Sequence, residues 1–356
     1  MSTTTAYAFA EFGGPIEPVE RPRPEPKGAE VLVAVSHCGV CHTDVHVHQG
    51  YYDIGGGERM LYRDRGVVPP ITMGHEVLGS VEAVGPDADP ALIGERRLVY
   101  PWIGCGACPG CARGEEQLCT APRYLGIFSP GGYARHVLVP DARYLLDVEG
   151  IEPGLAATLA CSGLTAFGAI RRAGPLHEGE AIAVMGCGGV GQAALELLRM
   201  QGAERVVALD PSAEKRAAVE ARGFAAALDP TAPDIGEALA RETGGRLAAV
   251  LDFVGSEATS SLALASLAKG GRYVVVGLYG GRLSYPLPFV PVRVLSILGS
   301  YVGSLGDLRE LLALLRREGA PHLDVETRPM EEAGRAVADL EAGRVAGRLV
   351  LTPAQD

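Results

Sequence analysis

The sequence has few lysines and no long apolar run. Only three lysines occur among its 32 Lys and Arg residues, whose charges are scattered, and 43 Asp and Glu residues give a net charge of −11. Without a basic cluster, we expect no nucleic-acid partner and no anionic membrane surface as a partner. No uninterrupted run approaches the ~18 apolar residues that a membrane-spanning helix needs.

The N-terminal stretch also lacks the basic and apolar segments of a secretory signal. We therefore expect a soluble, cytoplasmic protein. In that reducing compartment, the eight cysteines are better explained as metal ligands or free thiols than as disulfides. The 356 residues, 47% of them hydrophobic, suffice for two domains with separate cores.

The pattern of apolar residues changes near residue 160. Residues 1–160 contain short strand-like segments and turns, with a long polar loop at 51–68. From residue 181, strands and helices alternate, which predicts a parallel, doubly wound sheet over 161–298. The expected strands are 181–185, 205–209, 247–253 and 273–276, and the expected helices are 192–200, 214–222, 235–243 and 259–268. Residues 299–356 are expected to return to the domain formed by residues 1–160, with helices at 308–318 and 331–341 and a last strand from Arg348.

Residues 38–48, Cys-Gly-Val-Cys-His-Thr-Asp-Val-His-Val-His, concentrate thiols and imidazoles. Zinc prefers these ligands, although such a cluster also occurs as buried thiols beside surface histidines. Three other stretches favour the metal hypothesis: Gly74-His75-Glu76, a cysteine series at 105–119 and a glycine loop at 186–191. Together they indicate a zinc-dependent dehydrogenase.

The cysteine series is the most specific pattern in the chain. Cys105, Cys108, Cys111 and Cys119 lie on a glycine-rich segment with spacings of two, two and seven residues. Four thiolates can close tetrahedrally around one zinc ion and leave no open position, which is typical of a structural site. An iron–sulfur cluster and free thiols are the alternatives, and a single four-cysteine lobe in a β domain favours zinc.

The segment Gly186-Cys-Gly188-Gly-Val-Gly191 fits the dinucleotide-binding pattern G-x-G-x-x-G. It follows an apolar strand and opens a helix, and Asp210 ends the next strand. Gly186 would permit the tight turn, Gly188 the approach of a pyrophosphate and Gly191 close helix packing. The helix N-terminus would supply a positive dipole. The alternative is a glycine-rich turn that binds nothing.

A zinc site that polarises an alcohol needs three protein ligands and one open position. Our candidates are Cys41, His75 and Cys161, and the position of Cys161 at the domain junction would place the ion between the domains. Thr43 and His46 could relay the alcohol proton to solvent. Asp44 and Glu76 suit positions behind the ligands, one of them orienting His75. We interpret the remaining cysteines and histidines as ordinary core or surface residues: Cys38, Cys187, His37, His48, His136, His177 and His322.

These motifs occur in the order found in zinc-containing medium-chain alcohol dehydrogenases, and the resemblance covers essentially the whole chain. The chain most resembles the tetrameric bacterial and archaeal members. The resemblance implies a GroES-like catalytic domain, a Rossmann cofactor domain, two zinc ions per chain, NAD and a homotetramer or homodimer. It implies the catalytic zinc ligands and relay given above. It also implies cofactor contacts, namely His42 and Thr165 near the cofactor, Asp210 and Lys215 at the adenosine ribose, and Arg348 at the pyrophosphate.

The expected reaction is NAD-dependent oxidation of an alcohol to an aldehyde or ketone, and its reverse. A carbonyl reductase or a specialist for cyclic or aromatic alcohols is the nearest alternative, and a non-catalytic nucleotide sensor is another. The complete ligand set and the Thr43–His46 pair speak against a sensor. Trp102, Tyr124 and Leu278 are expected to line the pocket, which suggests a hydrophobic substrate.

Overall fold

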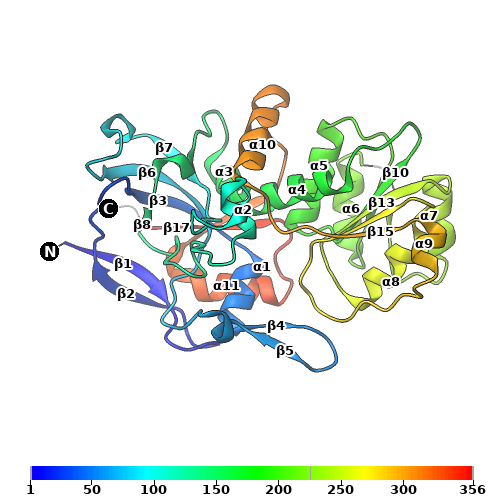
Figure 1. Ribbon diagram of the computed structural model, residues 1–356, viewed down its shortest axis with the longest axis horizontal. Helices are drawn as coiled ribbons and strands as arrows, with labels where there is room; N and C mark the ends of the chain where they lie inside the picture. Colours follow the sequence, from blue (N-terminus) through cyan, green and yellow to red (C-terminus); the bar gives the residue numbers. More distant parts are fainter. Residues whose placement is uncertain (1, 225, 355–356) are drawn as a thin grey trace. The chain divides into compact units, whose positions relative to one another are not determined.

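The computed structural model describes residues 2–224 and 226–354, which form two compact units. Unit 1 contains the chain up to Tyr51, Leu61–Leu164 and the chain from Gly303 onward. Unit 2 contains Thr165–Val302 and the short excursion Tyr52–Met60. Figure 1 shows the elements of each unit along the chain. The polar loop expected at 51–68 thus includes a small hairpin, and part of it belongs to the second unit.

Unit 1 is built on a seven-stranded sheet with the order β16-β17-β3-β6-β7-β9, with β8 also paired to β3. These strands are β3 (Val31–Val40), β6 (Glu76–Val84), β7 (Arg96–Val99), β8 (His136–Val139), β9 (Leu145–Leu146), β16 (Val325–Pro329) and β17 (Arg348–Thr352). A separate antiparallel hairpin is formed by β1 (Thr3–Ala8) and β2 (Glu17–Pro22). The small hairpin of the polar loop is β4 (Tyr51–Asp53) with β5 (Arg59–Leu61).

The register around β3 determines which residues meet at its carboxyl end. Gly39 pairs with Glu76 across the antiparallel β3–β6 ladder, and Val40 pairs with Leu349 across the β3–β17 ladder. Three distant parts of the sequence therefore lie side by side, namely the end of β3 and the starts of β6 and β17. This register brings the segment after β3, the start of β6 and the start of β17 to one place.

The helices of unit 1 surround this sheet. They are α1 (His42–Gln49), α2 (Pro109–Ala112), α3 (Pro153–Thr158), α10 (Leu305–Glu318) and α11 (Ala333–Glu341). Short 3₁₀ turns are η1 (Tyr62–Arg65), η2 (Pro90–Leu92), η3 (Glu116–Leu118), η4 (Ala142–Tyr144) and η6 (Met330–Glu332). The apolar side of α10 is Leu-rich, and Leu308, Leu311 and Leu312 are buried.

One helix is longer and more apolar than the sequence suggested. It runs over Pro153–Ala173 as α3, a π-helical turn η5 (Leu159–Gly163) and α4 (Leu164–Ala173). It has 21 residues, and its most apolar 18-residue window has a mean hydropathy of 1.4, so it is long and apolar enough to cross a membrane, contrary to the expectation that no segment would be. However, 89% of its most apolar window is buried inside the protein, which makes it a core helix.

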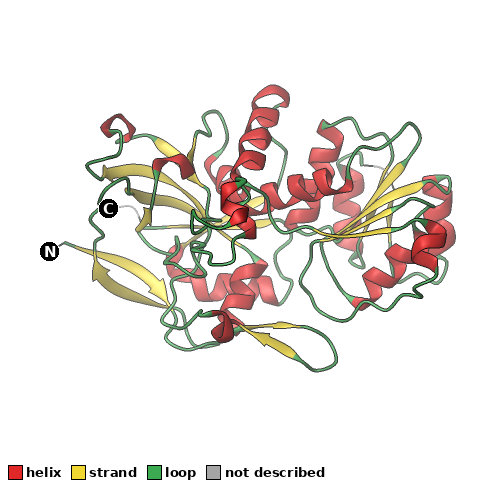
Figure 2. Ribbon diagram, in the orientation of Figure 1, coloured by secondary structure: helices red, strands yellow, loops and turns green. Residues whose placement is uncertain are grey.

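Unit 2 contains a six-stranded parallel sheet with the order β12-β11-β10-β13-β14-β15. The strands are β10 (Ala181–Met185), β11 (Val206–Leu209), β12 (Ala227–Leu228), β13 (Leu247–Asp252), β14 (Arg272–Val275) and β15 (Ser296–Gly299). The helices are α5 (Gly189–Met200), α6 (Ala213–Ala221), α7 (Ile235–Thr243), α8 (Glu257–Ser266) and α9 (Phe289–Arg293), and Figure 2 shows helices on both sides of the sheet.

The strand order of unit 2 is the 3-2-1-4-5-6 order of a dinucleotide-binding fold, and the direction in which successive strands are added reverses between β10 and β13. The continuous apolar runs of β10 and β13 are fully buried, as expected for parallel strands covered on both faces. The GroES-like plus Rossmann fold class is thus confirmed. The strand β15 and helix α9 lie in the region after residue 281 where the periodicity weakens, and the sequence did not predict them.

Candidate active site

Four buried side chains of unit 1 converge near the carboxyl end of β3. Cys41 caps the N-terminus of α1, His75 and Glu76 lie at the start of β6, and Cys161 lies in the π-helical turn η5. Their candidate ligand atoms lie within 4.8 Å of one another. The two Sγ atoms of Cys41 and Cys161 are 3.8 Å apart. The structure thus brings together the three ligands predicted from the sequence.

The polar atoms of this cluster fit a metal ion. Both ring nitrogens of His75 and Oε1 of Glu76 are buried without a hydrogen-bond partner in the described part of the chain. Such atoms destabilise a fold unless something satisfies them. Two thiols, an imidazole and a carboxylate form the donor set of a catalytic zinc ion. Since Nδ1 of His75 lies 3.3 Å from Oδ1 of Asp44, a zinc ion would satisfy the other ring nitrogen, Nε2, together with Oε1 of Glu76.

The thiols are prepared for metal binding. The pKa of Cys41 is held well below its usual value, chiefly because the Cys161 thiol donates a hydrogen bond to its sulfur, with a further contribution from His75. The same hydrogen bond and burial raise the pKa of Cys161. One thiolate therefore forms readily, and a divalent cation would compensate the charge of the second.

Asp44 holds the ligands in place from behind. Its Oδ2 accepts hydrogen bonds from the Cys41 N–H at 2.9 Å and from the Tyr133 hydroxyl at 3.2 Å. Its Oδ1 accepts from the Gly74 N–H and lies 3.3 Å from Nδ1 of His75. Burial lowers the pKa of His75, but Asp44 and Cys41 outweigh burial and the pKa is raised. Asp44 is thus the carboxylate that orients His75.

Glu76 lies nearer the ligands than a position behind them, since one of its oxygens belongs to the four-residue group. Its Oε2 accepts a hydrogen bond from Arg348 at 2.5 Å. Burial raises the pKa of Glu76 to about 7, and Arg348 opposes this shift. A Cβ atom on Gly39 would lie 1.8 Å from Oε2, so only glycine fits opposite this carboxylate. The sequence alone did not indicate that position 39 requires glycine.

Arg348 is almost fully buried in unit 1, where it lies beside Glu76. The structure describes this ion pair, and the contact of Arg348 with a pyrophosphate stays a prediction. Its position follows from the pairing of β17 with β3.

The predicted relay residues lie on α1. Thr43 and His46 are three residues apart, so they share one face of the helix, and both are partly buried, whereas His42 is exposed. Burial lowers the pKa of His46, and the neighbouring His42 lowers it further. His46 is therefore neutral at neutral pH, which is the form that accepts a proton.

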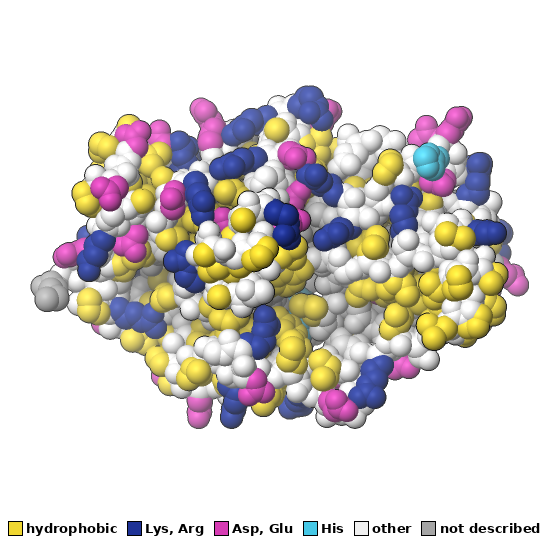
Figure 3. Space-filling view, viewed as in Figure 1, with side chains coloured by type: hydrophobic (Ala, Val, Ile, Leu, Met, Phe, Trp, Pro, Cys, Tyr) yellow, Lys and Arg dark blue, Asp and Glu magenta, His cyan; other side chains and the backbone are white. Residues whose placement is uncertain are grey.

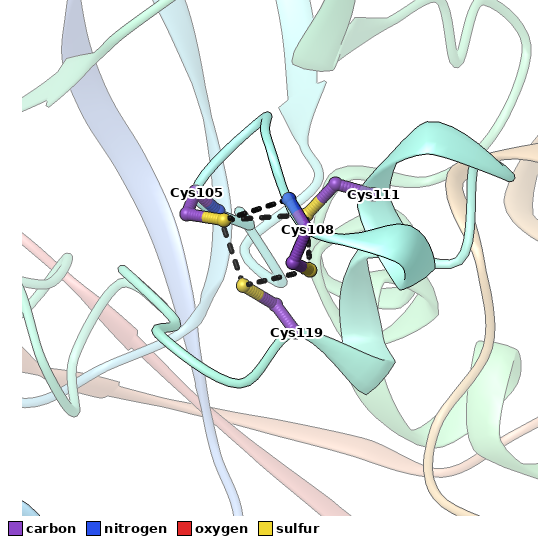
Figure 4. Close-up of side chains that lie close together, drawn as sticks. All are labelled: Cys105, Cys108, Cys111 and Cys119. Atoms are coloured by element: carbon purple, nitrogen blue, oxygen red, sulfur yellow. Dashed lines mark hydrogen bonds between the residues drawn. The ribbon is translucent and has the colours of Figure 1, made fainter.

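The four cysteines of the lobe form a second cluster (Figure 4). Sγ of Cys108 lies 3.5 Å from that of Cys111 and 3.8 Å from that of Cys119, and Cys105 and Cys111 are 4.0 Å apart. Backbone N–H groups of Cys111 and Thr120 lower the pKa of Cys108 to about 6. All eight cysteines are free thiols. This closed set of four sulfurs matches a structural zinc site.

A buried carboxylate fixes the lobe. Glu116 lies between the third and fourth cysteines, and its Oε2 accepts hydrogen bonds from the Gly104 N–H at 2.8 Å and the Tyr144 hydroxyl at 2.7 Å. Arg143 forms an ion pair with its other oxygen at 3.2 Å. The sequence pattern of cysteines did not indicate this residue, because its partners are distant in sequence.

In unit 2, the glycine loop connects β10 to α5. Gly186 has a φ of +89°, and a Cβ atom on Gly191 would lie 1.8 Å from the Gly186 carbonyl oxygen, so both positions require glycine. Gly188 is the N-cap residue of α5, so no side chain bonds to the first N–H groups of this helix. A Cβ atom on Gly188 would meet no atom within 4 Å. The first N–H groups of α5 are therefore available to an anion such as a pyrophosphate.

Asp210 follows β11 and is tied to this loop. Its Oδ2 accepts a hydrogen bond from the Cys187 N–H at 2.8 Å and its Oδ1 from the Ser212 N–H at 2.9 Å. Lys215 lies in the first turn of α6, and Arg216 donates to the carbonyl groups of residues 210 and 211. Thr165 is buried on α4. The acid thus follows the second strand of the parallel sheet, as predicted, and its contact with a ribose stays a prediction.

The expected pocket residues differ in their surroundings. Trp102 and Tyr124 are buried in unit 1, and the Trp102 ring lies 5.3 Å from the His75 ring. Leu278 belongs to unit 2 and is 43% exposed. Trp102 is therefore next to a metal ligand, and its role as a pocket residue stays a prediction.

Comparisons with known proteins agree with this geometry. A family model described as "Alcohol dehydrogenase GroES-like domain" matches residues 27–149, and one described as "Zinc-binding dehydrogenase" matches residues 189–317. The NAD-dependent alcohol dehydrogenase of Sulfurisphaera tokodaii is 35% identical over 350 residues, covering 98% of this chain and 99% of that protein.

Solved structures show the same similarity. The alcohol dehydrogenase of Aeropyrum pernix superposes with a TM-score of 0.87 at 31% identity, covering 98% of this chain and 100% of that chain. Acetophenone reductase from Geotrichum candidum, in complex with NAD, has a TM-score of 0.84 at 27% identity and covers 99% of this chain and 98% of that chain.

We predict two zinc ions per chain that single substitutions remove separately. Cys41→Ser should lose one ion and nearly all turnover while the fold persists. Cys108→Ser should lose the other ion and lower the free energy of unfolding by several kcal/mol, because zinc binding to a closed cysteine site contributes ~10 kcal/mol or more. Elemental analysis and thermal unfolding check both outcomes. A single zinc ion in the intact protein would refute the assignment of two sites.

Proposed function

This chain belongs to the zinc-binding, medium-chain alcohol dehydrogenase family and is an NAD-dependent oxidoreductase, and we propose that it oxidises primary or secondary alcohols to aldehydes or ketones and catalyses the reverse reduction. The observation that carries this proposal is the buried group of Cys41, His75, Glu76 and Cys161, in which Nε2 of His75 and Oε1 of Glu76 have no hydrogen-bond partner within the described residues. A non-catalytic sensor would not need a metal site that leaves a position for substrate.

The residues around the ligand group have distinct tasks. When bound, zinc supplies Lewis-acid chemistry to the substrate oxygen, and NAD accepts the hydride. Cys41, His75 and Cys161 hold the ion. Asp44 fixes the orientation of His75, since it lies 3.3 Å from its Nδ1. The Arg348 guanidinium opposes the burial that raises the pKa of Glu76, and so favours the charged form of this carboxyl group.

Thr43 and His46 move the alcohol proton toward solvent. They lie on one face of α1, directly after the ligand Cys41. The burial that lowers the pKa of His46 keeps its imidazole neutral and able to accept a proton from the threonine hydroxyl. This arrangement supports a hydroxyl–imidazole relay.

NAD binds to the carboxyl edge of the sheet in unit 2. Gly186, Gly188 and Gly191 shape the pyrophosphate site, and Asp210 with Lys215 binds the adenosine ribose. His42, Thr165 and Arg348 contribute further cofactor contacts. The open surroundings of Gly188 and the position of Asp210 after β11 support this assignment.

The substrate is a hydrophobic alcohol or carbonyl compound. Trp102 and Tyr124 contribute aromatic surface beside the metal ligands. The similarity to a protein named acetophenone reductase also favours an aromatic or bulky carbonyl substrate and keeps carbonyl reduction as a second candidate function.

The activity is tested with primary, secondary, cyclic and aromatic alcohols and the matching carbonyl compounds, followed by NADH absorbance. We expect turnover with at least one class, and His46→Gln should reduce alcohol oxidation ~10²-fold at neutral pH, where loss of the base matters most. In alkaline buffer the loss should shrink, because hydroxide replaces the relay. A pH–rate profile that overlays the wild type would remove His46 from the relay, and inactivity toward every class would refute the proposed function.

We predict that NAD is preferred over NADP at least tenfold. NADP would place a phosphate of about −1.5 to −2 charges against Asp210, and a unit pair at ~4 Å costs up to ~4 kcal/mol before solvent screening. Lys215 and Arg216 are the opposing charges, but Arg216 already donates to two backbone carbonyls.

Steady-state kinetics with both cofactors test this preference. Asp210→Gly should reduce the preference for NAD over NADP, mainly by weakening the binding of NAD. Asp234→Asn, a substitution at an exposed acid before α7, should leave this preference unchanged. Comparable kcat/KM values for the two cofactors in the wild type would show that Asp210 does not bind the ribose.

The free edge of the unit 2 sheet supports a homo-oligomer. β15 is an edge strand, and exposed apolar residues gather around it, namely Phe289, Val292, Val294 and Ile297, exposed by 50%, 66%, 60% and 39%. Figure 3 shows hydrophobic side chains clustered on this part of unit 2. An unpaired edge with an apolar flank invites strand pairing, and a second copy of the chain satisfies it with two-fold symmetry. We assign this edge to a homodimer that can assemble into a tetramer.

A charge on the edge strand should break this assembly. We expect Ile297→Lys to shift the protein to a smaller species in size-exclusion chromatography with light scattering, because the lysine would have to be buried between copies. The matched control is Ile93→Lys, at an isoleucine that is 52% exposed in unit 1. A wild-type monomer, or an Ile297→Lys protein of unchanged mass, would contradict the assignment.

A further inference from the structure

Trp102, the single tryptophan of the chain, lies beside two catalytic ligands. It contacts the ring of one ligand and the backbone next to the other. Its indole Nε1–H donates to the carbonyl oxygen of Ala160 at 3.0 Å, and Ala160 directly precedes Cys161. Its ring lies 5.3 Å from the His75 ring with an interplanar angle of 55°. The side chain is 1% exposed, so packing holds it in place.

A second aromatic contact, with Tyr124, connects Trp102 to the four-cysteine lobe. Tyr124 lies edge-on to the indole, with ring centroids 5.4 Å apart and an interplanar angle of 76°. The Tyr124 hydroxyl donates to the Gln117 carbonyl at 2.7 Å. Gln117 belongs to η3, the turn that follows Cys111 and ends directly before Cys119. A continuous set of contacts therefore joins the lobe to the catalytic ligands.

The backbone repeats this connection. The N–H groups of Arg123 and Leu125 donate to the carbonyls of Ile103 and Pro101 at 2.9 and 3.1 Å, which fixes the segments around Trp102 and Tyr124 against each other. The carbonyl of Gly104, just before Cys105, accepts hydrogen bonds from the Arg123 side chain. The segments that carry the two aromatic rings are thus bonded to each other and to the start of the lobe.

We propose that Trp102 is a positioning residue that couples the four-cysteine lobe to the catalytic metal site. This inference rests on the proposed function for the identity of the catalytic ligands and goes beyond it in assigning the lobe a second task. A metal ion in the lobe fixes η3, Tyr124 transmits that position to the indole, and the indole fixes His75 and the turn that carries Cys161. Pocket lining alone would need neither the Ala160 hydrogen bond nor the Tyr124 contact.

Conservative substitutions break this connection at two points. Trp102→Phe keeps a ring beside His75 but removes the Nε1–H, and Tyr124→Phe keeps the edge contact but removes the hydroxyl that reaches the lobe. Partners behind metal ligands typically change metal affinity or activity 10–100-fold. We expect either variant to release the catalytic-site metal ~10-fold faster to a chromogenic chelator, at the lower end of that range. The kcat for alcohol should fall, and the KM for NAD should stay unchanged.

The release phases are assigned with variants that lack one site. The phase that disappears in Cys41→Ser belongs to the catalytic site, and the phase that disappears in Cys108→Ser belongs to the lobe. Tyr100→Phe is the matched control, because this buried tyrosine donates to the Gly303 carbonyl at 3.0 Å and stacks on Tyr144. It should alter stability but not the catalytic-site release rate.

A double-mutant cycle measures the coupling itself. Cys108→Ser should accelerate catalytic-site release in the wild-type background, shift the emission of the single tryptophan, and have little further effect on release in the Trp102→Phe background. Independent, multiplicative effects of the two substitutions would overturn the proposal, as would wild-type release rates in both aromatic variants. If the intact protein holds no metal at Cys41, His75 and Cys161, the proposed function fails instead, so the two failures are distinguishable.

Discussion

The pairing of β3 with β6 on one side and β17 on the other is the constraint on which the active site depends. It places the residues after Val40, the start of β6 and Arg348 at one edge of a sheet. Gly39 is the narrowest point of this arrangement, because a side chain there would collide with the Glu76 carboxylate. A shift of one residue in either ladder would turn the ligands to the opposite face and separate them.

The chemistry follows from burying charge at that edge. Asp44, Glu76 and Arg348 are almost fully removed from solvent together with two thiols and an imidazole. Such groups are costly unless they are paired. Asp44 accepts hydrogen bonds, and one guanidinium nitrogen of Arg348 donates to Glu76. Within the described residues, however, Nε2 of His75, Oε1 of Glu76 and Nε of Arg348 have no hydrogen-bond partner. The site is therefore complete only with a cation, which connects the stability of unit 1 to its catalytic role.

Several features could be read from sequence because their signals are local. The alternation of strands and helices from residue 181 predicted the parallel sheet, and four of its six strands followed from apolar runs, whereas the short β12 and the edge strand β15 did not. The four cysteines and the G-x-G-x-x-G loop carry their geometry in their spacing. Other features escaped: β15 and α9 lie where periodicity fades, and the apolar helix Pro153–Ala173 was hidden by the small and polar residues among its apolar ones.

The sequence by itself determined the fold class, the family resemblance and the types of ligand, since each depends on residue identity and on spacing along one segment. Only the tertiary structure decided that Glu76 joins the ligand group, that Arg348 pairs with it, and that Trp102 lies between the two cysteine-containing sites. These contacts join residues far apart in sequence, since Arg348 comes 272 positions after Glu76. No local pattern encodes such a distance, because it is fixed by strand register and packing.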